Sequence, residues 1–109
     1  MHNFLKVVIA GLICAASAHA EVDAKIVRTW KAKCASCHGV DGKGNTEIGK
    51  KAKISDFTKR DWQKSKTDAQ LKTAIENGVK KDGAEMDPYK DKLDAAQIDG
   101  LVKYIRKLK

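Results

Sequence analysis

Residues 34–38 form the part of this 109-residue chain that is best suited to chemistry. They read Cys34-Ala35-Ser36-Cys37-His38, a C-x-x-C-H pattern in which two thiols precede an imidazole. This is the attachment signature of a c-type haem, because two sulfurs about one helical turn apart suit the two porphyrin vinyl groups. The pattern predicts that Cys34 and Cys37 bind one haem c covalently and that His38 is the proximal iron ligand.

The first 20 residues have the layout of a secretory signal peptide. Lys6 precedes an apolar stretch that reaches about residue 16, and Ala18-His19-Ala20 is a small-x-small cleavage site. The stretch is too short to span a bilayer, and Ile13 before Cys14 disfavours a lipoprotein signal. We expect cleavage after Ala20, export to the periplasm, and a mature domain of residues 21–109 without a transmembrane segment.

Loss of the signal peptide simplifies the set of candidate ligands. Residues 21–109 contain one histidine, His38, one methionine, Met86, and the two motif cysteines. The sixth iron ligand is then Met86, a lysine, or absent. Three Cys and His ligands fall short of the usual four of a structural zinc site. A disulfide between Cys34 and Cys37 would close a very small loop and stabilise little, and a bare dithiol protein is a further alternative.

The composition of the mature chain indicates a missing apolar partner. Residues 21–109 contain only 16 Leu, Ile, Val and Phe residues, together with 21 basic and 14 acidic side chains. Such a composition is typical of disorder, yet the chain has well-patterned helices. A buried haem would resolve the conflict, since it supplies apolar surface and a covalent staple to a small domain.

The periodicity predicts an all-α fold. A first helix is expected from about Asp23 to Cys37, with Gly39 at its end, followed by a polar loop over residues 39–45. We predict no strand and no internal repeat. Phe57 and Trp62 are interpreted as core residues that pack beside the haem.

Two later helices have clear start signals. Thr67 and Gln70 form a capping box for a helix that Gly78 ends. Asp94 and Gln97 cap the last helix. Its apolar face comprises Ile98, Leu101, Val102, Ile105 and Leu108.

With these motifs in place, the mature chain resembles the class I cytochromes c of the small bacterial monohaem type. The resemblance rests on residues 34–39, on Asp41-Gly42-Lys43-Gly44, on Met86-Asp87-Pro88-Tyr89 and on residues 101–105. It implies four to five short helices around one haem, with the first and last helices crossing near right angles. It also implies that Met86 is the distal iron ligand, although a lone methionine is more often core filler.

Three positions depart from the family pattern. Asp87 separates Met86 from Pro88, where the family usually has Met directly before Pro. The family often has a proline shortly after the haem motif, but the only proline here is Pro88, so a carbonyl between Ile48 and Ile54 is expected to accept the hydrogen bond from His38. Ile26 occupies the position where the family often has glycine, and we predict that Gly100 restores close contact between the terminal helices.

These features predict a periplasmic one-electron carrier rather than an enzyme. Thioether ligation favours ferrous iron and so raises the reduction potential. The alternative is a haem enzyme or gas sensor with an open sixth position. Exposed lysines are expected to steer a monomeric protein to respiratory redox partners with acidic docking surfaces, and we predict no nucleic-acid binding. The basic clusters are Lys50, Lys51 and Lys53, then Lys59 and Arg60, Lys80 and Lys81, and Lys90 and Lys92.

Overall fold

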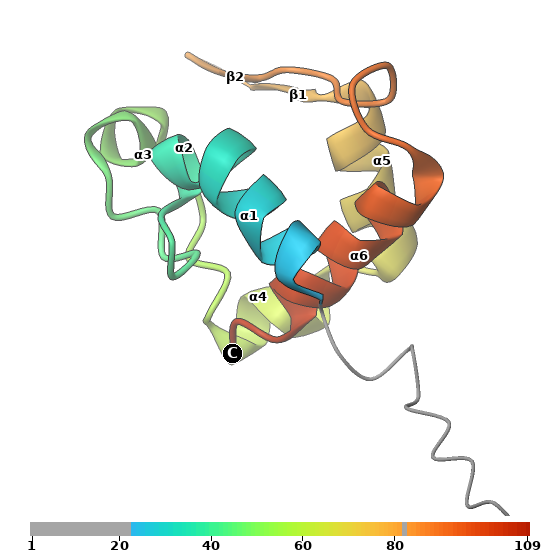
Figure 1. Ribbon diagram of the computed structural model, residues 1–109. Coiled ribbons are helices and arrows are strands. Elements are labelled where there is room, and N and C mark those ends of the chain that lie inside the picture. The colour runs from blue at the N-terminus through green and yellow to red at the C-terminus, as the bar shows by residue number, and fades with distance from the viewer. Residues whose placement is uncertain (1–22, 82) are drawn as a thin grey trace, which may run out of the picture.

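The computed structural model describes residues 23–81 and 83–109, so the predicted signal peptide lies outside the described residues. This part of the chain contains six helices and one antiparallel pair of short strands (Figure 1). In chain order they are α1 (Ala24–Lys33), α2 (Ala35–His38), α3 (Glu47–Ala52), α4 (Arg60–Ser65), α5 (Asp68–Asn77), β1 (Val79–Lys81), β2 (Ala84–Met86) and α6 (Ala95–Arg106). None of the described helices has the length and apolar character needed to cross a bilayer.

The helix starts follow the local signals in the sequence. The Asp23 carboxylate accepts a hydrogen bond of 3.0 Å from the Ile26 N–H and caps α1. The predicted capping boxes are both confirmed: Thr67 with Gln70 opens α5, and Asp94 with Gln97 opens α6. Each box satisfies two backbone N–H groups that a helix end would otherwise leave without a partner.

The predicted helix from Asp23 to Cys37 is not continuous. α1 ends at Lys33, and Cys34 takes a φ of −116° before α2 begins at Ala35. The Cys34 N–H still donates to the Trp30 carbonyl at 2.9 Å, so it closes the last turn of α1 while the chain changes direction. Gly39 ends α2 with a φ of 84°, as the sequence predicted.

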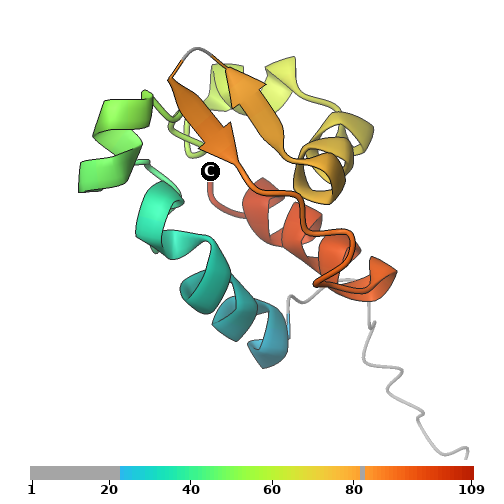
Figure 2. The same ribbon diagram turned by 90° about the horizontal axis from the view of Figure 1, so that it is seen from above.

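The main core lies where α1, α5 and α6 meet. Trp30 of α1 and Leu101 of α6 are its most deeply buried large side chains, at 2% and 1% exposure. Figure 2 shows α1 and α6 side by side, with α5 on the far side of α6. The buried apolar residues of the cluster are Ile26, Trp30, Leu71, Ile75, Leu93, Ile98, Leu101, Val102 and Ile105.

α1 and α6 are in contact, and Gly100 of α6 lies against Ile26 of α1. A Cβ on Gly100 would lie 2.6 Å from Ile26 Cδ1 and 2.8 Å from Ile26 Cγ1. Only a residue without a side chain fits there, because Ile26 is itself buried. The prediction that Gly100 compensates for Ile26 is therefore confirmed.

The expectation that the chain forms no strand is wrong. β1 and β2 pair antiparallel, with Val79 opposite Met86 and Lys80 opposite Glu85. The hairpin extends from the end of α5 toward α3 in both views (Figures 1 and 2). Because Met86 pairs with Val79, the hairpin returns Met86 to the end of α5.

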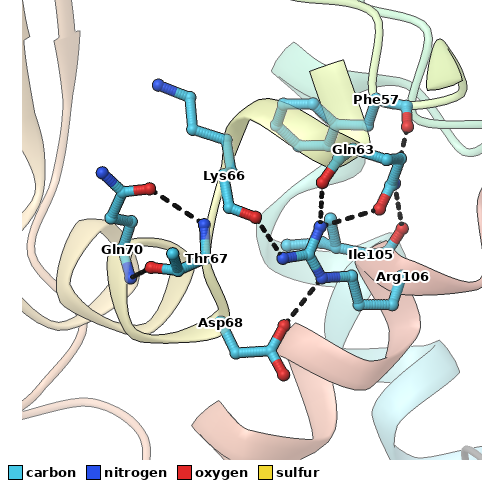
Figure 3. A network of polar contacts seen from close by, with 8 residues as sticks. All are labelled: Phe57, Gln63, Lys66, Thr67, Asp68, Gln70, Ile105 and Arg106. Atoms are coloured by element: carbon cyan, nitrogen blue, oxygen red, sulfur yellow. Dashed lines mark hydrogen bonds and ion pairs between the residues drawn. The ribbon is translucent and has the colours of Figure 1, made fainter. Parts of the chain in front are cut away.

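A buried polar network fastens α4 to the end of α6 (Figure 3). The Gln63 amide donates to the carbonyls of Phe57 and Ile105 at 2.7 and 2.8 Å. Arg106 donates to both the carbonyl and the side-chain oxygen of Gln63, to the Lys66 carbonyl, and to the Asp68 carboxylate at 2.7 Å. Every polar atom of the Gln63 side chain thus has a partner, which accounts for its burial.

Candidate functional site

The two motif cysteines lie where α1 passes into α2. Both are free thiols and half-buried, and Cys34 packs against the main core. Burial raises the pKa of the Cys34 thiol to about 11, although the charge of Lys33 opposes the shift. Helix α2 holds Cys37 and His38 in a single short turn directly after Cys34. The predicted motif residues are therefore together in one half-buried segment.

The His38 imidazole lies among aromatic side chains. Its ring centroid is 4.8 Å from that of Phe57 and 5.8 Å from that of Trp30. Phe57 in turn stacks on Trp62 at 4.1 Å, so the interpretation of these two aromatics as core is confirmed. Burial lowers the pKa of His38 below its usual 6.5, so the neutral imidazole that can bind a metal prevails at neutral pH.

One nitrogen of the His38 ring is buried and makes no hydrogen bond to the described residues. Within the described residues, His38 Nδ1 has no hydrogen-bond partner. The predicted bond to a carbonyl between Ile48 and Ile54 is therefore not formed. The Gly49 carbonyl in that segment instead accepts from the backbone N–H of Ile54 at 3.0 Å. Buried polar atoms are seldom left unpaired, so Nδ1 is an exception among the buried side-chain atoms of the described residues.

Helix α3 holds the motif from outside. Thr46 caps α3 and its hydroxyl donates to the Cys37 carbonyl at 2.6 Å. A Cβ on Gly49 would lie 2.7 Å from the same carbonyl, so glycine is needed for this close approach. Neither Thr46 nor Gly49 was predicted from the sequence as part of the site. The signal was available in Thr46-Glu47, a good helix start, but six-residue helices have little periodicity.

The backbone after His38 is fixed by two further hydrogen bonds. The Gly44 N–H donates to the His38 carbonyl at 2.7 Å, and the Trp30 indole donates to the Gly39 carbonyl at 3.0 Å. The indole bond is buried and joins α1 to the loop that follows the motif. These contacts orient the segment that carries the imidazole.

Met86 is the last residue of β2, half-buried, and packs against the same core cluster as Cys34. Gly78 allows its backbone to come close: a Cβ there would lie 2.3 Å from the Met86 carbonyl oxygen, and its φ is +74°. Three residues on, the Tyr89 hydroxyl donates to the Lys33 carbonyl at 3.1 Å. The hairpin thus brings Met86 and the haem motif, distant in sequence, to one core.

Two of the alternative uses of the cysteines, a disulfide and a zinc site, are not formed in the described residues. The two thiols are not joined in a disulfide. No cluster of three or more His, Cys, Asp or Glu side chains suited to a metal ion occurs in residues 23–81 and 83–109. The two free thiols and the neutral imidazole fit a covalent haem, which needs two sulfurs and one imidazole from the same segment.

Comparison with known proteins agrees with this chemistry. The sequence model of the family described as "Cytochrome C oxidase, cbb3-type, subunit III" matches residues 21–105. Among solved structures, the c-type cytochrome KustC0563 is 28% identical with a TM-score of 0.67, over 76% of this chain and 95% of that one. A point mutant of the same cytochrome gives 28% identity and a TM-score of 0.68, over 77% of this chain and 98% of the other. No curated protein matches the chain.

The fold and the motif therefore define a c-type cytochrome. The chain belongs to the family of cbb3-type cytochrome c oxidase subunit III domains and is a small monohaem class I cytochrome c. Its cofactor is a covalently bound haem c, and its general function is haem-based electron transfer.

Proposed function

We propose that this protein is an exported one-electron carrier whose haem is attached through Cys34 and Cys37 and ligated by His38 and Met86. The observation that carries the proposal is that Cys34 and Met86 pack against one core, and that Cys37 and the half-buried His38 directly follow Cys34 in α2. Residues 1–20, with their signal-peptide layout, support export to the periplasm.

In this function the polypeptide acts by holding ligands in place. Haem c supplies a reversible Fe(III)/Fe(II) couple when it is bound. Trp30 and Phe57 confine the His38 ring, and the hydrogen bonds to the His38 and Gly39 carbonyls fix its backbone. The hairpin positions Met86. Rigid ligands keep structural change small when an electron arrives or leaves, and no residue has to act as an acid, base or nucleophile.

The basic surface supports docking to acidic redox partners. The lysines and arginine of the predicted clusters are exposed, and they lie on α3, at the start of α4, on β1 and between β2 and α6. The large apolar side chains that are most exposed in the described part are those of Val40 and Ile48. Val40 lies two residues after His38, and Ile48 lies in α3. Apolar contacts bordered by positive charge suit a transient complex steered by an acidic partner.

The ligation is tested by Met86→Leu, which keeps the volume of the side chain and removes the sulfur. If Met86 only fills the core, the variant behaves as the wild type does. If Met86 binds iron, the weak near-infrared thioether–Fe(III) band disappears, the reduction potential falls and CO binds the ferrous protein. Val79→Leu is the matched control, because Val79 pairs with Met86 in the hairpin and is also half-buried.

Two measurements separate the carrier from its alternatives. Mass spectrometry and a pyridine haemochrome assay of the exported protein report covalent haem, and a colourless folded product would favour the dithiol protein. Absence of the thioether band in the wild type, with ready CO binding at neutral pH, would favour the haem enzyme or gas sensor. Co-purification with a membrane oxidase would assign the domain to a larger complex, as the description of its family suggests.

A further inference from the structure

Tyr89 joins two distant parts of the haem site. It lies three residues after Met86, and its hydroxyl donates to the carbonyl of Lys33 at 3.1 Å. Lys33 is the last residue of α1 and directly precedes Cys34. This hydrogen bond therefore links the segment of the proposed distal ligand to the segment of the proposed thioethers.

The backbone of Tyr89 is anchored as well. Its N–H donates to the Ile75 carbonyl of α5 at 2.9 Å, and its carbonyl accepts from the Leu93 N–H at 2.9 Å. The Lys92 ammonium lies 5.3 Å from the centre of the ring. Burial raises the pKa of Tyr89, so the phenol stays protonated and remains a donor at neutral pH. Tyr89 is thus tied to α5 through its backbone and to α1 through its side chain.

We propose that Tyr89 is a positioning residue whose hydroxyl latches the Met86–Tyr89 segment to the end of α1 and so limits release of the Met86 sulfur. The proposal rests on the ligation by Met86 proposed above. When that segment moves away from α1, the bond from Tyr89 to Lys33 has to break, because Tyr89 belongs to the segment and Lys33 belongs to α1. The latch then stabilises the closed state relative to the open one.

The size of the effect follows from the value of one hydrogen bond. A net contribution typical of a single protein hydrogen bond corresponds to roughly a two- to tenfold change in the population of the open state. An external ligand that binds iron only in the open state gains apparent affinity by the same factor. Imidazole added to the ferric protein is a suitable probe, since it competes with the thioether for the sixth position.

Tyr104→Phe is the matched control for Tyr89→Phe. Tyr104 is also half-buried and donates its hydroxyl to a backbone carbonyl, that of Val40, at 3.3 Å. It packs against Trp30 at 4.9 Å between ring centroids, and it belongs to α6 rather than to the Met86 segment. Both variants lose one hydroxyl and one hydrogen bond, so general loosening affects them alike.

The experiment titrates the ferric haem-loaded wild type and both variants with imidazole and compares their unfolding in denaturant. We expect Tyr89→Phe to bind imidazole about two to ten times more tightly than the wild type, and Tyr104→Phe to stay within about twofold. An unchanged Tyr89→Phe, or an equal gain in both variants, would overturn the latch. A wild type without the thioether–Fe(III) band would instead reject Met86 as the ligand.

Discussion

Replacement of Gly100 by alanine tests how tightly α1 and α6 are packed. Alanine is about 1 kcal/mol better than glycine inside a helix, so Gly100→Ala would stabilise an open surface of α6. Here the new methyl group would lie 2.6 and 2.8 Å from two carbons of Ile26, which is only 7% exposed. Overpacking of this kind costs about 1–3 kcal/mol. We therefore expect Gly100→Ala to lower the free energy of unfolding by about 1 kcal/mol.

The sign should reverse when Ile26 is shortened. Ile26→Ala removes both close carbons and leaves only the Ile26 Cβ, at an ordinary 3.8 Å. That change alone should cost about 2–5 kcal/mol through the cavity it creates. In its background, Gly100→Ala should stabilise by about 1 kcal/mol, which gives a coupling energy of about 2 kcal/mol between the two sites.

The four proteins of this cycle can be compared by guanidinium unfolding of the ferric haem-loaded form, followed by circular dichroism. The comparison requires the same denaturant dependence in all four, so that the midpoints report stability. Gly100→Ala that stabilises both backgrounds equally would show that the helices have room at this point, and would refute the packing argument.

Three further outcomes follow from the structure. Gly78→Ala should destabilise the protein by at least about 1–2 kcal/mol, because alanine is strained at the positive φ of this position. It should also weaken the thioether–Fe(III) band, because the new Cβ would lie 2.3 Å from the Met86 carbonyl oxygen. Gly83→Ala is the control: its φ of +73° gives the same backbone strain, but nothing lies within 4 Å of the new Cβ, so the band should remain. Gln63→Leu should lower the free energy of unfolding by about 2–4 kcal/mol, since it leaves the Phe57 and Ile105 carbonyls and part of Arg106 without partners; a loss below about 0.5 kcal/mol in urea would contradict the role of the network. In the haem-free protein, where His38 is not bound to iron, burial lowers the pKa of His38 below 6.5 and the unfolded chain holds the proton more tightly. Its stability should therefore be complete above about pH 6.5 and fall as the pH drops below it, and equal denaturation midpoints of the haem-free protein at about pH 7.5 and 5.5 would contradict this linkage.

The features that the sequence predicted well are those set by neighbouring residues. The C-x-x-C-H segment and the two capping boxes each involve residues within four positions of one another. Their geometry follows from local chemistry. The contact of Gly100 with Ile26 joins distant residues, and it was predicted only because Ile26 stands where the family often has glycine.

The features that were missed depend on contacts between distant residues. Helices α3 and α4 have six residues each, too few for a clear apolar stripe, and they form because Thr46 and Gln63 find partners elsewhere. The hairpin had a signal in Asp82-Gly83, a dipeptide favoured in two-residue turns, but the flanking segments are polar. The bond from Tyr89 to Lys33 spans 56 positions, and no local pattern indicates it.

The raised pKa of Cys34 bears on the order of events during biogenesis. In the folded chain its thiol is half-buried and stays protonated up to strongly alkaline pH, so the reactive thiolate is scarce at physiological pH. A chain that matured into its final shape too early would shield the sulfur it needs for the proposed attachment. The raised pKa of Cys34 thus favours haem attachment before the chain has fully folded.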